Sequence, residues 1–347
     1  MNELYYYIRE DSTGKINNYQ FLRNVRYSQN IDISFISSRI YSKIKNTEFQ
    51  QYTYSDIINS IDINLTIYEP IKVLFKKDID DNIDDNIDNI ILIISKLVNL
   101  CNNKSINQLD ITIFLMSDKK EITNDTSIIG DGDVNSGCSI VNNINNKIYI
   151  WRKEEVNKVL IHELIHSLDL DPISSNYNYD FFLTKFSYCP KEINLFESYV
   201  EFWATLINIL FVMAKNKSEF SSFETFIENE IEFGYKQSSK LLIYNDIYNF
   251  KDFYSTNHNI TSCKFKEESN VFMYYLGKLL LLINYREVLN LCELYRKGYI
   301  LNIKRSYEFT EKLINIMLDS LDEGAIDKFN YLLKLKYNNS LRMSYYG

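Results

Sequence analysis

The chain has 347 residues, of which 46% are hydrophobic and 24% are charged, and its formal net charge is −8. This composition is typical of a globular protein with a sizeable core and excludes a disordered chain. The negative charge argues against a general nucleic-acid binder, which needs a basic face. Abundant Tyr and scarce Pro and Gly are typical of proteins from AT-rich genomes, such as those of giant DNA viruses, clostridia or protists.

The five cysteines are scattered, and no two of them have Cys-x-x-Cys spacing. They indicate neither a disulfide framework nor a structural zinc knuckle and favour a reducing compartment. The first eleven residues carry three acidic side chains and no apolar centre of a signal peptide. The longest apolar stretch, 203–214, is too short to span a bilayer. We therefore expect a cytoplasmic protein, in the host cytoplasm or the virion if the source is viral, without a membrane partner.

Residues 1–100 are expected to form an N-terminal, mostly helical region. Its clearest element is a helix with one apolar stripe, because Ile, Leu and Val recur at spacings of three and four from 79 to 98. The Asp-rich run 78–85 precedes this stripe. It is interpreted as a solvated helix N-terminus that the helix dipole favours, in preference to a cation site.

Residues 101–215 are expected to form the central core. The segments 109–116 and 148–151 have the partial alternation and the β-branched content of strands. The turn-rich segment between them resembles a calcium loop, but Ser136 and Asn142 stand where an EF-hand needs Gly and Glu. The EF-hand pattern therefore fails, and the segment is interpreted as a loop.

The predicted core ends with two helices, at about 153–169 and 192–215. Residues 216–347 are expected to form a C-terminal helical region. Three segments of that region have helical periodicity: 223–244, 271–285 and 307–335. No linker rich in Pro, Gly or Ser interrupts the chain. The sequence thus predicts an α+β fold, mainly helical, that forms one compact unit.

The first of these helices contains the motif His162-Glu163-Leu164-Ile165-His166. Histidines at i and i+4 lie on one helix face, so both imidazoles can bind one zinc ion. Glu163 can then act as general base toward a water on the metal. The chain has only three histidines, so the motif is improbable by chance. The alternative is an ordinary amphipathic helix with two surface histidines.

A catalytic zinc site needs three protein ligands and an open position. Asp169 and Pro172 stand where a metzincin has Gly and His, which excludes that class. Glu197 and Glu201 lie one turn apart and are the only charged residues in 196–214. Two carboxylates on an apolar helix face need partners, and zinc for Glu197 and a ligand imidazole for Glu201 would supply them. Two alternatives remain, in which Glu201 is the ligand or the pair faces water.

These motifs resemble those of the gluzincin zinc metallopeptidases. The His-Glu-Leu-Ile-His form is seen in clostridial neurotoxin light chains, and the segment from Glu197 to Ala204 is similar to the glutamate helix of anthrax lethal factor. The resemblance covers 159–204. It implies a zincin-like core, made of a small mixed sheet, an active-site helix and a glutamate helix, with helical flanks. The sequence departs from the pattern at Glu201, where thermolysin-type enzymes have Asp.

The resemblance also implies the site. One Zn²⁺ per chain would be held by His162, His166 and Glu197, with Glu163 as the base and a peptide or protein as the substrate. Asp169 is a candidate to orient an imidazole or, alternatively, a residue of the helix end. The oxyanion of the reaction needs a hydrogen-bond donor, and four side chains are candidates by position: Tyr188, Tyr199, Tyr235 and His258.

The sequence leaves other interpretations open. The segment 148–151 is a candidate edge strand for an extended peptide, or an ordinary core strand. A deformylase-like amidase would use Cys138 as a ligand, although the glycine-rich motif of that family is missing. A catalytically silent zincin fold, used for binding or in a virion, would need the ligands but no base, and the presence of Glu163 argues against it.

Overall fold

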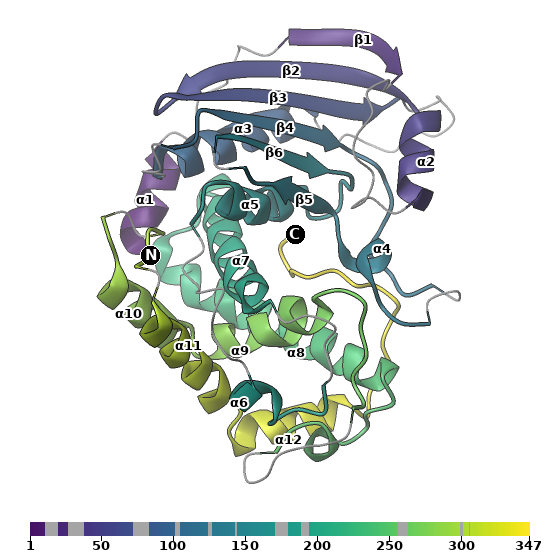
Figure 1. Cartoon of the computed structure of the whole chain (residues 1–347), viewed down its shortest axis with the longest axis vertical. Helices are drawn as coiled ribbons and strands as arrows, with labels where there is room; N and C mark the ends of the chain where they lie inside the picture. Colours follow the sequence, from purple (N-terminus) through teal and green to yellow (C-terminus); the bar gives the residue numbers. More distant parts are fainter. Residues whose placement is uncertain are drawn as a thin grey trace.

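A six-stranded mixed sheet lies above a layered set of helices in the computed structural model of the chain (Figure 1). The structure describes residues 1–10, 20–26, 38–71, 83–100, 105–123, 127–142, 144–170, 180–188, 194–255, 263–298, 301–304 and 306–347.

The strand order in the sheet is β1-β2-β3-β4-β6-β5. The strands are β1 (Gln20–Arg26), β2 (Glu48–Ile58), β3 (Ile61–Pro70), β4 (Gln108–Phe114), β5 (Gly137–Ile140) and β6 (Asn145–Ile150). β3, β4 and β6 run parallel, and the other neighbours pair antiparallel. The short strand β5 therefore forms one edge of the sheet, and it is the edge nearest to the helices (Figure 1).

Each face of the sheet has its own apolar cluster. On one face, β-branched side chains of the central strands pack against α3 (Ile83–Leu100) and α5 (Val156–Ser167) in the main core. Alternation along β3 directs Ile61, Ile63 and Leu65 into this core. The other face carries a smaller, aromatic cluster under α2 (Ser38–Asn46). Burial on both faces fixes the register of the strands.

The main core continues into the helical part below the sheet. Its centre is α7 (Leu195–Lys215), which packs on α5, on α8 and on α1. The other helices are α1 (Asn2–Glu10), α4 (Asp131–Val134), α6 (Asp180–Leu183), α8 (Phe223–Tyr244), α9 (Lys278–Ile283), α10 (Tyr285–Tyr295), α11 (Tyr307–Asp319) and α12 (Glu323–Leu332). The described elements also include two short 3₁₀ helices, Phe220–Ser222 and Phe250–Asp252. A single turn of π-helix, Met273–Gly277, is called the π-turn below.

The mixed architecture agrees with the expected α+β class, but the N-terminal region, expected to be mostly helical, combines three helices with three strands. Residues 1–100 supply three of the six strands, and β3 pairs with β4, so one sheet crosses the expected boundary at 100. The reason is the dense Tyr, Ile and Thr content of these segments, because β-branched and aromatic side chains suit a pleated surface.

The expected C-terminal helices form with breaks that periodicity did not reveal. The helix at 223–244 has the predicted bounds. The segment 271–285 begins instead with the π-turn. The segment 307–335 is divided because Asp322 accepts a hydrogen bond from the Ala325 amide at 2.7 Å and so starts a new helix, α12.

The last ten residues, 338–347, form a C-terminal strap that returns to the N-terminus of α5 (Figure 1). The Glu155 carboxylate accepts hydrogen bonds from the amides of Met343 and Ser344, at 2.9 and 2.6 Å. Glu230 accepts further amides of the strap. Buried lysines donate to the carbonyls of the strap: Lys240 and Lys278. The strap is therefore held through its backbone by buried charged side chains.

Among the described residues, α7 alone is long and apolar enough to cross a membrane, with a mean hydropathy of 1.4 over its most apolar window. That window is 83% buried inside the protein. The length of α7 exceeds the apolar stretch noted from the sequence, because Leu195 to Phe202 extend the helix. Its burial is that of a core helix.

Candidate metal centre

Helix α5 presents the two motif histidines to α7. The helix is buried along most of its length, because it lies between the sheet, α3 and α7. The ring centroids of His162 and His166 are 4.9 Å apart, as expected one turn apart on one helix face. α5 starts after Glu155 and ends at Ser167, so it is shorter at both ends than the predicted 153–169.

Helix α7 brings Glu197 to both imidazoles. Glu197 Oε2 lies 3.2 Å from His162 Nε2 and 3.6 Å from His166 Nε2. The three donor atoms lie within 4.8 Å of one another, and this is the group of described residues that could hold a metal ion. The structure therefore brings the three predicted ligands together.

One carboxylate oxygen of the cluster has the surroundings expected of a metal ligand. Glu197 Oε2 is shielded from solvent and has no hydrogen-bond partner among the described residues. A buried carboxylate oxygen in this state is costly unless a cation or a donor reaches it. Two imidazole nitrogens and one carboxylate oxygen form a donor set that suits zinc.

Glu201 contacts the other nitrogen of the first histidine. Its Oε1 lies 2.9 Å from His162 Nδ1, whereas Glu197 faces Nε2 of the same ring. Its Oε2 pairs with Lys158 Nζ. Glu201 is thus placed to orient His162 and lies outside the three-ligand group, in agreement with its expected role.

Electrostatics around the cluster favour a positive charge at its centre. Burial lowers the pKa of His162, but the carboxylates of Glu197 and Glu201 outweigh burial and raise it to about 9. Burial raises the pKa of Glu197, but the neighbouring His166 and His162 outweigh it and lower it to about 2. The buried carboxylates therefore stabilise a cation between them.

Glu163, the predicted base, points toward the edge strand β5. Burial raises its pKa, and the hydrogen bond from the Ser139 hydroxyl opposes this shift. A Cβ built on Gly137 would lie 2.9 Å from Glu163 Oε1. Glycine is therefore needed at this position for the strand to approach the carboxylate.

The structure decides between the two alternatives for the segment 148–151 in favour of a core strand. Residues 148–150 belong to β6, which pairs with β4 on one side and with β5 on the other. The true edge, β5, is only four residues long and contains Gly137, so it has little strand signal of its own.

A small pocket of about 30 Å³ opens beside His162 and Glu163. One of its walls is Tyr274, whose ring centroid lies 6.2 Å from that of His162. Burial and the nearby Glu197 carboxylate hold the pKa of Tyr274 well above its usual value, so its phenol stays protonated. Sequence reasoning missed Tyr274, because the π-turn that carries it has no simple sequence pattern.

The three tyrosines expected as oxyanion donors lie elsewhere. The Tyr188 hydroxyl donates to Glu267. The Tyr199 hydroxyl lies 3.7 Å from Cys292 Sγ in the core. The Tyr235 ring packs against Phe329. All three are core aromatics, and Tyr274 is the tyrosine that lines this pocket among the described residues.

The remaining candidates are placed as follows. Asp169 follows the end of α5, with a positive φ of 56° and an exposed side chain. His258 lies outside the described residues. Cys138 packs with the aromatic cluster under α2, and burial raises the pKa of its thiol. It does not belong to the three-ligand group, so the deformylase-like alternative loses its ligand.

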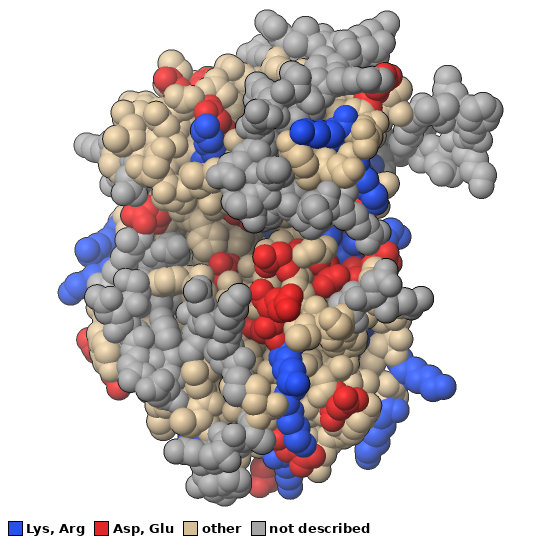
Figure 2. Space-filling view, turned by 45° about the vertical axis from the view of Figure 1, so that its right-hand side comes forward, with Lys and Arg blue, Asp and Glu red and all other residues tan. Residues whose placement is uncertain are grey.

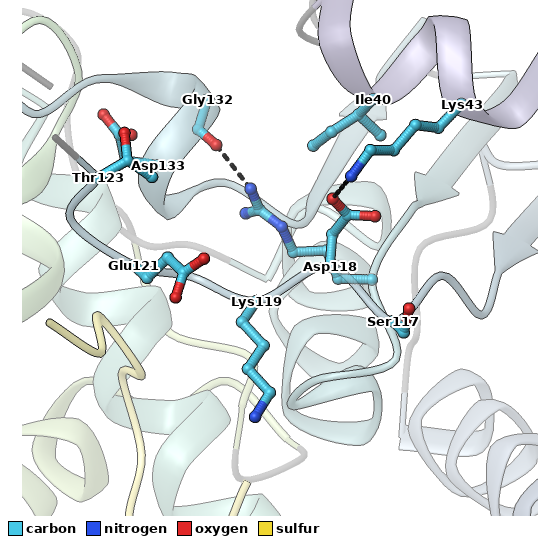
Figure 3. A pocket seen from close by; sticks show the side chains of 10 residues that line it. Ile40, Lys43, Ser117, Asp118, Lys119, Glu121, Thr123, Gly132 and Asp133 are labelled. Atoms are coloured by element: carbon cyan, nitrogen blue, oxygen red, sulfur yellow. Dashed lines mark hydrogen bonds and ion pairs between the residues drawn. The ribbon is translucent and has the colours of Figure 1, made fainter. Parts of the chain in front are cut away.

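Acidic side chains gather on the face shown in Figure 2, at mid-height between the upper and lower parts of the molecule. Beyond α4, a separate pocket of about 340 Å³ contains an ion pair between Lys43 and Asp118 (Figure 3). In the same pocket Arg152 donates to the Gly132 carbonyl at 2.6 Å. Since Gly132 lies shortly before β5, Arg152 fixes the segment that leads into the edge strand.

Comparisons with known proteins give one short similarity. A stretch of 119 residues is 29% identical to Uncharacterized protein R210 of Acanthamoeba polyphaga mimivirus. It covers 31% of this chain and 29% of that protein. No family model matches the chain, and no solved structure matches it.

Proposed function

We propose that the protein is a zinc-dependent metallopeptidase with a zincin-like core of the gluzincin type. The observation that carries the proposal is the buried Oε2 of Glu197, which accepts no hydrogen bond from the described residues and lies 3.2 and 3.6 Å from the Nε2 atoms of His162 and His166. A glutamate that serves as base, Glu163, lies between those histidines in the sequence and beside the pocket in space. A purely structural metal site would need the three ligands but not the Glu163 carboxylate.

A zinc ion bound by His162, His166 and Glu197 would supply Lewis acidity toward a water molecule and a peptide carbonyl. Glu163 would take a proton from the water as the water oxygen attacks the carbonyl carbon, and would pass that proton to the amine as the C–N bond breaks. Its place beside the pocket, next in sequence to His162, suits both transfers. Tyr274 donates its phenolic proton in a hydrogen bond to the developing oxyanion.

The proposed substrate is an extended peptide or protein segment. Within the described part of the chain β5 pairs with β6 alone, so its other edge has backbone groups available to an added strand. A peptide on that edge would pass Gly137 and therefore Glu163. The three described free cysteines, Cys138, Cys263 and Cys292, support our proposal of a reducing, cytoplasmic compartment.

The test measures zinc per chain by plasma mass spectrometry on the wild type, Glu197→Gln and Glu230→Gln, purified side by side. Glu230 is a buried glutamate of α8 that binds the strap, so its variant controls for the loss of a buried carboxylate. One zinc in the wild type and in Glu230→Gln, and its loss in Glu197→Gln, is the expected result. A wild type without metal would contradict the proposal.

A second arm separates an enzyme from a silent binding module. Glu163→Gln is expected to keep its zinc and to lose cleavage of an unstructured protein such as casein. If the wild type binds zinc, and this variant and the wild type behave alike in every assay, the silent zincin fold becomes the better interpretation.

A further inference from the structure

A buried lysine lies directly behind the metal cluster. Lys158 sits on α5 one turn before His162, and its side chain is 0% exposed. Its Nζ pairs with Glu201 Oε2, while Glu201 Oε1 lies 2.9 Å from His162 Nδ1. The three side chains form a continuous line that ends on the ring whose other nitrogen faces Glu197.

A lone carboxylate at this place would be poorly fixed. Glutamate has three rotatable side-chain bonds, and in α7 nothing but its contacts decides which oxygen faces His162. Lys158 occupies one oxygen and leaves the other directed at Nδ1. The lysine and the histidine come from one helix and the glutamate from another, so the line also fixes the spacing of α5 and α7 at the cluster.

The charges of the site also require the lysine. Three buried carboxylates, those of Glu163, Glu197 and Glu201, surround the cluster. A divalent cation and the Lys158 ammonium together balance them. Without the ammonium, Glu201 would lose its direct ion pair and keep only the imidazole of His162 and the charge of Lys278 near it, which is unfavourable.

We propose that Lys158 is a positioning residue for the metal centre. By holding Glu201 it keeps the negative charge of Oε1 2.9 Å from His162 Nδ1. That charge favours the proton on Nδ1, which would leave Nε2 free to bind a metal ion. This inference rests on the proposed zinc site, and it adds a residue that does not itself touch metal or substrate.

The test compares zinc dissociation constants, measured by competition with a chromophoric chelator, for the wild type and Lys158→Met. We expect binding about 10- to 100-fold weaker in the variant, the range seen when partners of metal ligands are removed. Lys158→Arg, which keeps the charge, should restore most of the affinity. Lys240→Met is the matched control, because Lys240 is also buried but binds the strap, and its affinity should equal that of the wild type.

A double-mutant cycle shows whether Lys158 acts through Glu201. In a Glu201→Gln background the further change Lys158→Met should weaken zinc binding by less than about twofold, because the route to His162 is already lost. An independent readout is the ¹⁵N shift of the His162 ring, which should show a mixture of tautomers in Lys158→Met. Circular dichroism checks folding, and Lys158→Gln replaces Lys158→Met if the latter does not fold.

Wild-type affinity in folded Lys158→Met, or an equal loss in Lys240→Met, would overturn the inference while leaving the zinc site intact. An additive loss in the double variant would overturn it too. A wild type that binds no zinc would overturn the proposed function and this inference together.

Discussion

Gly137 and Glu163 lie so close that a single methyl group between them would displace the carboxylate: a Cβ at Gly137 would be 2.9 Å from Oε1. The contact joins the edge strand of the sheet to the helix that carries His162 and His166. The same Cβ would also meet Val159 Cγ1, at 2.8 Å. A side chain at position 137 should therefore displace the proposed base, together with Val159, while His162, His166 and Glu197 stay unchanged in the sequence.

Gly137→Ala should lower the rate of peptide cleavage by about 100-fold, because an error of about 1 Å in a catalytic group costs that much. The zinc content should stay at the wild-type value. Gly130→Ala is the control, since a Cβ there would meet its nearest neighbour at an ordinary 3.4 Å. Equal cleavage rates in both variants would show that the position of Glu163 is not limiting.

Tyr274→Phe should reduce kcat by about 100- to 1000-fold, as expected for the loss of one oxyanion donor, with little change in KM. The phenyl ring keeps the wall of the pocket, so zinc should remain bound. Tyr199→Phe removes a hydroxyl of the core and should leave kcat unchanged. Steady-state kinetics on a fluorogenic peptide would check both, and an unaltered kcat in Tyr274→Phe would remove this residue from the mechanism.

Glu267 should make stability depend on pH. Burial raises its pKa to about 7, against the opposing hydrogen bonds from Tyr188 and the Phe272 amide, whereas its usual value is 4.5. The folded state thus binds the proton more tightly than the unfolded state. This contribution to the free energy of unfolding is fully present below pH 4.5. It is lost as the pH rises toward 7, on the order of 3 kcal/mol in all.

Urea unfolding of the wild type and Glu267→Gln at pH 5 and pH 8 measures this contribution. The variant should lose less stability than the wild type between the two pH values, since its amide does not titrate. Other groups titrate equally in both proteins, so the difference between them isolates Glu267. Parallel pH dependence in the two proteins would contradict the assignment.

Glu155→Ala should destabilise the fold by about 3–5 kcal/mol, because it leaves the Lys120 ammonium buried without its partner. It also removes the acceptor for two strap amides. Glu224→Ala breaks an exposed ion pair with Arg286 and should cost less than about 1 kcal/mol. Chemical denaturation of both variants tests the contrast, and equal losses would show that the buried pair does not hold the strap.

The sequence predicted the grouping of His162, His166 and Glu197 better than it predicted the fold around them. These residues could be found because helical spacing is local. Residues four apart share one helix face, which holds for His162 and His166 and for Glu197 and Glu201. That α5 and α7 pack together followed from the cost of burying two carboxylates. These arguments need no knowledge of the rest of the chain.

The parts that were missed depend on distant contacts. Tyr274 reaches the pocket from a π-turn more than 100 residues after His162. Nothing in the local sequence distinguishes Lys158 from other polar helix residues, because its burial depends on the packing of α7 against α5. β5 lies at the edge because of the strand order of the whole sheet, whose strands come from segments far apart in the sequence. Periodicity does not carry such information.

The strap gives the protein a late step in its folding. Glu155 and Ser344 are 189 residues apart in the sequence, yet they are joined by a hydrogen bond of 2.6 Å at the start of the helix that bears the motif. Closing so long a loop costs chain entropy. The hydrogen bonds that offset this cost form only when the strap is in place. Residues 338–347 are made well after α5 and α7, and Met343 of the strap lines the pocket beside His162 and Glu163. The pocket should therefore gain this wall only after the strap has been made and has docked.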